Sequence, residues 1–325
     1  MSRRRVLAGT AASAVLVLGL AACSTAGAPE PATSPGAAAT SATGAAATSA
    51  GDGGTTAERL DSAAEATDLK VVTDLLGSML PDPGSAAARD AATSSVASDA
   101  VVHDGSAQAA GPDALLARFS AVQSRVPGAQ LVTKHLASDG DLVAVHWQAT
   151  ATPSDETTGE AEVDLFRVAD GKVAEAWALS QPVPATSASG NSMFSDLYQG
   201  DEAAPVPTEE DEEAQRTFAV QAYDTLFRDQ DASVLDRSFS PGYLQHNAIA
   251  PNGTDALKGF FAAGSQIPRS ESVVSLSDGD VVWTFSRPVG AAADAPFGAV
   301  DLFRVDSSGS SPTIVEHWDV VPQAG

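Results

Sequence analysis

The pattern of apolar and polar positions divides most of the chain into helical segments that are followed by strands. In the C-terminal half, Phe218, Ala222 and Leu226 recur at helical spacing after Thr208, which can cap a helix whose first turn is acidic. Two shorter helices are expected next, one holding Val234, Leu235 and Phe239 before Pro241 and one over residues 255–264. Strands rich in β-branched and aromatic residues then follow at 272–276, 281–285, 297–305 and 313–321. Helices before antiparallel strands predict an α+β fold, with a curved sheet wrapped around the helices.

The same pattern occurs twice. Residues 163–168, Val-Asp-Leu-Phe-Arg-Val, recur identically at 300–305. Asp139-Gly140-Asp141-Leu142-Val143 is echoed at 278–282, and Gly111-Pro112-Asp113-Ala114-Leu115 is echoed at 253–257. Ordered matches of this kind predict tandem domains, at residues 68–184 and 209–325, joined by a linker over 185–208.

The last strand carries the candidate chemistry. Alternation places Val315, His317 and Asp319 on one face of this strand, and Ile314, Glu316, Trp318 and Val320 on the other. The first copy keeps the Glu and the Trp, but Ala176 and Ala178 replace the His and the Asp. An imidazole beside a carboxylate is a plausible acid/base pair, so only the second copy is expected to carry one. Alternatively, the pair lies on the outer sheet face and bonds a neighbouring strand or subunit.

The N-terminus predicts export and lipid attachment. Residues 1–22 combine three arginines with a short apolar stretch, which is typical of a signal peptide. Leu20-Ala21-Ala22-Cys23 resembles a bacterial lipobox, so we expect Cys23 to be lipidated and to hold the protein on the extracytoplasmic face of the cell membrane. Export through the twin-arginine or the general secretory route both fit. Residues 23–67, rich in Ala, Ser, Thr, Gly and Pro, are expected to be a disordered tether.

Charge and composition exclude several partners. The formal net charge is −24 and would reach −27 without the three signal-peptide arginines, which argues against nucleic acid as a partner. A single Cys leaves no internal disulfide. The five histidines show no metal-ligand spacing and no dinucleotide motif occurs, so no metal and no cofactor are expected.

His146, where the second copy has Phe285, is expected to be exposed on its strand. Asp164 and Asp301, inside the identical strands, are expected to hold structural hydrogen bonds.

The chain also resembles a known family. Four segments carry the resemblance to the SnoaL-like family of the nuclear-transport-factor-2-like superfamily: Tyr243–Asn247, Gly253–Phe261, Val300–Arg304 and Glu316–Asp319. The first copy shares the identical strand, Glu175 and Trp177, and His103 corresponds to His246 only if one residue is deleted from the following loop. The resemblance implies two tandem cone-shaped α+β barrels, each with an apolar pocket beneath its curved sheet. Tyr223, Trp283 and Phe303 are expected to line that pocket in the second copy.

Two functional hypotheses follow from this resemblance. Family members include polyketide cyclases and isomerases that use acid/base chemistry, which implies a cofactor-independent lyase or isomerase acting on a small apolar, carbonyl-bearing molecule. Asp319 would be the base, His317 its partner, and His246 or Tyr243 the hydrogen-bond donor; His246 could equally end a polar strand. Alternatively, both domains are non-catalytic ligand-binding or protein-interaction modules of the cell envelope. The two copies are expected to pack as an intramolecular pseudo-dimer that buries Trp177 and Trp318.

Overall fold

The computed structural model describes residues 63–105, 107–200, 205–262 and 267–322. The expected signal peptide, Cys23 and the tether up to residue 62 lie outside these residues. Residues 63–67, also expected in the tether, instead begin the first helix, because alanine at three of these five positions favours helix. None of the helices in the described ranges is long and apolar enough to cross a membrane.

Each half of the described chain begins with helices. In the first half these are α1 (Ala63–Met79), α2 (Ala86–Ser95) and α3 (Pro112–Arg125). In the second half they are α4 (Glu209–Tyr223), the π-helical turn η1 (Asp224–Arg228), the 3-10 turn η2 (Ala232–Val234), α5 (Leu235–Ser238) and α6 (Thr254–Ala262). Thr208 caps α4 as expected, in a capping box with Asp211.

Eleven strands in the described residues form two sheets. The six strands of the first are β1 (Val96–Asp104), β2 (Ala107–Ala110), β3 (Gln130–Asp139), β4 (Leu142–Thr150), β5 (Glu160–Ala169) and β6 (Lys172–Pro182), in the order β2-β1-β6-β5-β4-β3. The five of the second are β7 (Phe239–Gln245), β8 (Ser270–Asp278), β9 (Val281–Pro288), β10 (Ala299–Asp306) and β11 (Thr313–Val320), in the order β7-β11-β10-β9-β8. Gly140 and Gly279 have positive φ in the two matching hairpin turns, the conformation that glycine adopts readily in an Asp-Gly turn.

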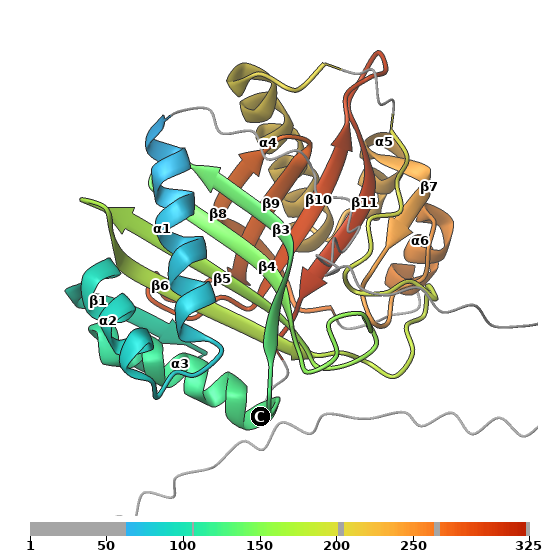
Figure 1. Cartoon of the computed structure of the whole chain (residues 1–325). Helices are drawn as coiled ribbons and strands as arrows, with labels where there is room; N and C mark the ends of the chain where they lie inside the picture. Colours follow the sequence, from blue (N-terminus) through green and yellow to red (C-terminus); the bar gives the residue numbers. More distant parts are fainter. Residues whose placement is uncertain (1–62, 106, 201–204, 263–266, 323–325) are drawn as a thin grey trace, which may run out of the picture. The chain divides into compact units, whose positions relative to one another are not determined.

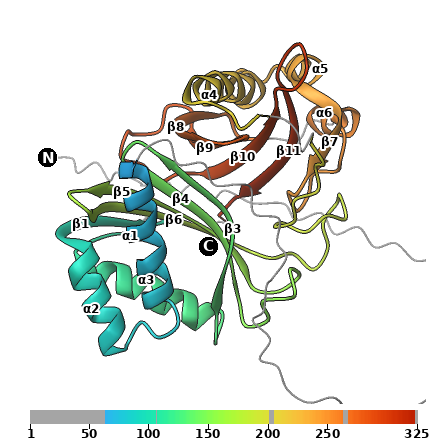
Figure 2. The same ribbon diagram turned by 45° about the horizontal axis from the view of Figure 1, so that its top comes forward.

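The helices cover one face of each sheet. Buried residues of α1, α2 and α3 pack on Val143, Trp147 and Phe166 of the first sheet. Those of α4, η1 and α6 pack on Val282 and Phe303 of the second. Figures 1 and 2 show both arrangements. We call these covered faces the inner faces. The fold is therefore mixed α+β, consistent with the nuclear-transport-factor-2-like architecture.

Two details of the second sheet differ from expectation. Phe239 and Pro241, expected at the end of a helix, belong to β7, which pairs in parallel with β11. β11 is bulged, because Arg304 pairs with Glu316 whereas Val305 pairs with Ile314. The extra residue turns Ile314 to the inner face, into the same core as Phe303, instead of the face of Trp318.

The outer faces of both sheets contribute to one apolar cluster. Val163, Leu165 and Leu179 of the first sheet are buried in it together with Trp318 and Leu302 of the second. Trp177 packs against the same cluster, and Met193 and Phe194 of the connecting segment lie within it. Edge hydrogen bonds join β3 to β8 as well, since Ser138 N donates to Asp278 Oδ2 over 3.0 Å. The second sheet therefore has an inner face toward its own helices and an outer face in this shared cluster.

Candidate functional site

The inner face of the second sheet holds a group of buried polar side chains. Asp301 of β10 pairs directly with Asp319 of β11, and Phe303 pairs with His317. His317, Asp301 and Asp319 are only 4%, 5% and 6% exposed. The predicted dyad thus lies toward the helices, and the outer-face alternative does not describe this structure. We call Asp301, His317 and Asp319 the inner triad.

Both ring nitrogens of His317 face oxygen atoms. Nδ1 lies 2.7 Å from Gln245 Oε1, and Nε2 lies 3.0 Å from Asp301 Oδ1. The orientation of the Gln245 amide is set by Asn247, whose backbone N–H donates to the same Oε1 over 2.9 Å. Because that oxygen is an acceptor, His317 Nδ1 must carry a proton. The proton between Nε2 and Asp301 is therefore shared by an imidazolium–carboxylate pair or by a neutral imidazole and a carboxylic acid.

Asp319 is a buried carboxyl with incomplete hydrogen bonding. Asn247 Nδ2 donates to Asp319 Oδ2 over 2.5 Å. Asp319 Oδ1 and Asp301 Oδ2 have no hydrogen-bond partner among the described residues. Burial raises the pKa of Asp319 to about 6, against the opposing attraction of His317, and the nearby Asp301 raises it further. The carboxyl therefore titrates near neutral pH, where a general base is useful.

Aromatic residues surround the triad on the same inner face. The rings of Phe303 and Tyr243 lie 4.9 Å and 6.2 Å from that of His317. Burial, together with the charges of Asp301 and Asp319, raises the pKa of Tyr243 well above its ordinary value, so its hydroxyl stays protonated. Tyr223 belongs to the same core and lies 3.0 Å from Ser270 through its hydroxyl.

Trp283 is not part of this environment. It is fully buried, but it lies in the outer-face cluster, on the opposite side of β9 from Val282. Of the three residues expected to line a pocket, the structure therefore brings together Tyr223 and Phe303 and separates Trp283 from them. The cause is strand parity, because neighbouring residues of a strand face opposite sides.

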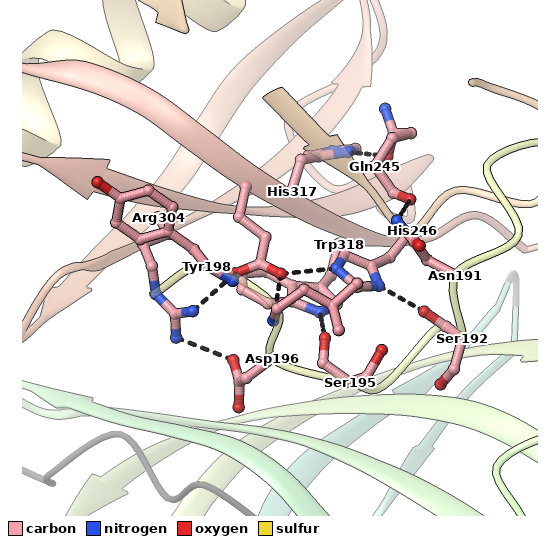
Figure 3. Close-up of polar contacts among 12 residues, drawn as sticks. Asn191, Ser192, Ser195, Asp196, Tyr198, Gln245, His246, Arg304, His317 and Trp318 are labelled. Carbon is pink, nitrogen blue, oxygen red and sulfur yellow. Dashed lines mark hydrogen bonds and ion pairs between the residues drawn. The ribbon is translucent and has the colours of Figure 1, made fainter. Parts of the chain in front are cut away.

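His246 is also separated from the triad. Its Nε2 lies 2.8 Å from Glu316 Oε1, and its ring stacks on Trp318 with centroids 5.1 Å apart. Glu316 and Trp318 belong to the outer face, and Figure 3 shows His317 and Trp318 pointing to opposite sides of β11. The structure thus unites Tyr243, His317 and Asp319 and places His246 in a different, fully buried polar network.

In the first copy, a different set of side chains satisfies the equivalent carboxylate. Asp164 accepts a hydrogen bond from Trp147 Nε1 over 2.7 Å and another from Arg118 Nη2 over 3.1 Å. Arg118 comes from α3, is 3% exposed and also bonds Glu162 over 2.7 Å. Ala178 pairs with Asp164 where the second copy has Asp319 opposite Asp301. The expectation of a structural hydrogen bond is thus met at Asp164, whose partners are an arginine and an indole.

The inner triad is also the group of described residues whose spacing would suit a metal ion. One ligand atom from each of the three residues can be chosen so that all lie within 4.8 Å of one another. A histidine ligates metal through a deprotonated ring nitrogen. Both nitrogens of His317 are already engaged, by Gln245 and by Asp301. We therefore interpret the triad as a proton-sharing group.

Sequence reasoning missed Asp301, Gln245 and Asn247. The recurrence of Asp164 and Asp301 in identical strands was a usable signal, because consecutive antiparallel strands place Asp301 opposite the last strand. Gln245 and Asn247 flank the proposed donor His246 in sequence, but alternation turns them to the inner side.

His146 was expected to be exposed and is instead fully buried, with Nδ1 2.9 Å from His135 Nδ1.

Comparison with known proteins identifies one domain. The family model for the SnoaL-like domain matches residues 85–176, so this part of the chain is a SnoaL-like domain, in the copy that lacks the dyad. No curated protein matches the chain. Similar solved structures include a proposed SnoaL-like polyketide cyclase from Jannaschia sp. CCS1, with 19% identity, 38% of this chain and 91% of the other covered, and a TM-score of 0.32. Another is a proposed SnoaL-like isomerase from Agrobacterium tumefaciens, which is 14% identical. The match covers 35% of this chain and 98% of the other, with a TM-score of 0.30.

Proposed function

We propose that the second copy, residues 209–325, binds a small apolar molecule with a carbonyl group and performs cofactor-free acid/base chemistry on it, as a lyase or isomerase. The observation that supports this most directly is the buried Asp319, whose pKa of about 6 lies close to neutral and whose Oδ1 has no partner among the described residues. A partly bonded carboxylate next to an imidazole is a suitable base for a weakly acidic carbon.

The reaction step follows from these positions. Ionised Asp319 removes a proton from the carbon next to the carbonyl, and the electron pair of that C–H bond moves to the carbonyl oxygen to form an enolate. Tyr243, protonated at every working pH, is the available neutral donor for that oxygen. The proton shared by His317 and Asp301 stabilises the negative charge nearby. Return of the proton to a different atom, or attack of the enolate on a second carbonyl, completes an isomerisation or an aldol reaction.

For the first copy, residues 68–184, we propose a non-catalytic role. Its Asp164 is neutralised by Arg118, and alanines stand in place of the dyad. The two copies would form tandem cone-shaped barrels packed as a pseudo-dimer, with 185–208 as the linker. The shared outer-face cluster supports this packing. Separate expression of the two copies, followed by a binding measurement between them, would test it.

We further propose that the protein is a lipoprotein on the extracytoplasmic face of the membrane, anchored through Cys23. The lipobox-like sequence before Cys23 supports this. Replacing Cys23 by Ser should release the exported protein from the membrane fraction, and retention of the variant there would contradict lipid anchoring.

Exchange of carbon-bound protons for deuterium tests the chemistry without knowledge of the natural substrate. NMR would follow the α-protons of 1,3-diketones and β-keto esters in heavy water with the full chain. We expect faster exchange with the wild type, with a rate that rises with pH through about 6, and loss of the effect in Asp319→Asn. Asp294→Asn, at an exposed loop carboxyl, is the matched control and should behave as the wild type.

Two results of this experiment would contradict the proposal. Equal exchange rates with the wild type and Asp319→Asn would show that Asp319 is not the base. Loss of exchange on addition of a chelator would show that the triad works through a metal ion instead of a shared proton.

A further inference from the structure

The same four side chains lie on the outer face of each sheet. In the second copy they are His246, Arg304, Glu316 and Trp318; in the first they are His103, Arg167, Glu175 and Trp177. The histidine lies 2.8 Å from the glutamate in the second copy and 2.9 Å in the first. It stacks on the tryptophan with centroids 5.1 Å apart in one and 5.3 Å in the other. The arginine lies over that ring, at 5.1 Å and 6.0 Å.

In the second copy this quartet is covered by the segment that connects the two copies. We call residues 191–198 the strap and these four residues the covered quartet. The backbone N–H groups of Leu197 and Tyr198 donate to Glu316 over 2.7 Å and 3.1 Å. Trp318 Nε1 donates to Ser195 O over 3.1 Å. Under the strap, His246 and Glu316 have fully buried side chains.

Side chains and carbonyls of the strap satisfy the remaining groups. Asp196 Oδ1 lies 2.9 Å from Arg304 Nη2, and Ser192 O lies 2.5 Å from His246 Nδ1. The strap therefore binds as an extended peptide through its backbone, with one acidic side chain for the arginine. The covered quartet is an occupied peptide-binding site within the chain.

In the first copy, no strap-like segment of the described residues covers the same four side chains, which we call the open quartet. The side chains of His103, Glu175 and Arg167 are 19%, 31% and 38% exposed. Trp177 Nε1 makes no hydrogen bond to the described residues, and Glu175 accepts none from a backbone N–H there. The carboxylate and the indole that the strap uses at Glu316 and Trp318 are thus present without a backbone partner among the described residues, while Glu175 keeps its contact with His103 and Arg167 bonds Asp141.

We propose that the open quartet is a docking site for an extended peptide segment of another protein, bound as the strap binds the covered quartet. The segment would carry Asp or Glu opposite Arg167, with its next two backbone N–H groups donating to Glu175 and a preceding carbonyl accepting from Trp177. The strap's Ser-Asp-Leu-Tyr is the pattern on which this chemistry is based. The partner is a foreign chain because the strap of a second copy already fills its own covered quartet.

The surroundings of the open quartet define its preference further. Asp196 also lies 3.2 Å from His135, which pairs with His146 on β3 and β4. The equivalent pair on β8 and β9 is Val274 and Phe285, and Phe297 lies 5.9 Å from Trp177. A docked segment would thus lack the ion pair that Asp196 of the strap makes with His135.

The probe is a fluorescein-labelled, end-capped peptide of residues 191–200, added to the full chain and followed by fluorescence anisotropy. We expect saturable binding that weakens at least tenfold in Glu175→Gln, since one peptide N–H would bond a neutral amide oxygen and the other would face an NH2 group that cannot accept. Trp177→Phe should also weaken it, because the ring remains but the N–H is lost. Changing the peptide's Asp to Asn should weaken binding to the wild type.

Three outcomes would overturn the proposal. One is absence of saturable binding to the wild type at millimolar peptide. Another is binding that Glu175→Gln leaves unchanged, which would place the peptide on the covered quartet in exchange for the strap. The third is a dimeric wild-type chain that Glu175→Gln converts to monomer, which would assign the site to a second copy. Circular dichroism spectra and unfolding midpoints matching those of the wild type would establish that the partly exposed Glu175 and Trp177 tolerate these changes.

Discussion

Replacing Asp319 by Asn should make the protein more stable at neutral pH while removing its proposed base. The pKa of Asp319 is raised from 3.8 to about 6 by burial, which Asp301 reinforces. At 1.36 kcal/mol for each pKa unit, ionisation of this carboxyl in the folded state costs about 3 kcal/mol more than in the unfolded chain. Asn has no such cost, and it can still accept the hydrogen bond from Asn247 Nδ2.

The sign of the pH dependence follows from the raised pKa. Between the unfolded pKa and about 6, the folded state holds a proton that the unfolded state has released. This contribution to stability is complete below pH about 4 and is lost as the pH rises to about 6. The difference between Asp319→Asn and the wild type should therefore be smallest at pH 4 and reach about 3 kcal/mol in favour of the variant by pH 8.

Urea unfolding at five pH values from 4 to 8 measures this difference directly. The titrating groups away from the inner triad are the same in the wild type and the variant, so their effects cancel in the comparison. Asp294→Asn, at an exposed site, should follow the wild type throughout. A variant less stable than the wild type at pH 8, or a difference that does not change with pH, would refute the assignment of a destabilising, buried charge to Asp319.

Three other changes test the remaining buried networks. Arg118→Leu should lower the free energy of unfolding by about 3–5 kcal/mol, because the buried Asp164 would lose its counter-charge and Glu162 would keep only Arg125. A loss below about 1 kcal/mol in urea unfolding would contradict this. Glu316→Gln should speed proteolysis within residues 191–198, since Arg304 and two strap N–H groups lose their carboxylate partner. The control Glu175→Gln should leave the rate of cleavage there unchanged. Equal cleavage of both variants, measured by mass spectrometry, would count against the strap contacts. Burial holds the pKa of His146 well below 6.5, so stability should fall as the pH drops below 6.5, where the unfolded chain takes up the proton. His146→Gln should reduce this pH dependence of the thermal unfolding midpoint. An unchanged pH dependence in the variant would show that another group causes it.

Local patterns predicted much of the fold. The identical segments at 163–168 and 300–305 became matching strands, β5 and β10, because a short run rich in Val, Leu and Phe favours a buried strand without distant partners. The Asp-Gly turns and the cap at Thr208 were predictable for the same reason. Strands β1 and β7 were not, since each pairs in parallel with the last strand of its copy, far away in sequence.

The site was predicted only in part, because its composition depends on strand parity between distant segments. His317 and Asp319 alternate within one strand, so their common face could be read directly. His246 lies on β11's other side because His317 pairs with Gln245, a register that no local pattern contains. The bulge that moved Ile314 to the inner face also depends on the pairing between strands, since Ile314 pairs with Val305 of β10. The alternation within the last strand alone does not predict it.

The contrast between the two copies explains why only one retains a reactive site. Both keep the same aspartate in the same strand, and a buried carboxylate needs a partner in either. In the first copy, Arg118 and Trp147 donate fixed hydrogen bonds to Asp164, which oppose the rise in its pKa that burial causes. In the second, His317 provides a proton that can move, and Asp319 adds a second carboxyl that competes for it. A site for proton transfer thus arises where the aspartate's partner is itself titratable, and the same position becomes structural where the partner is a permanent cation.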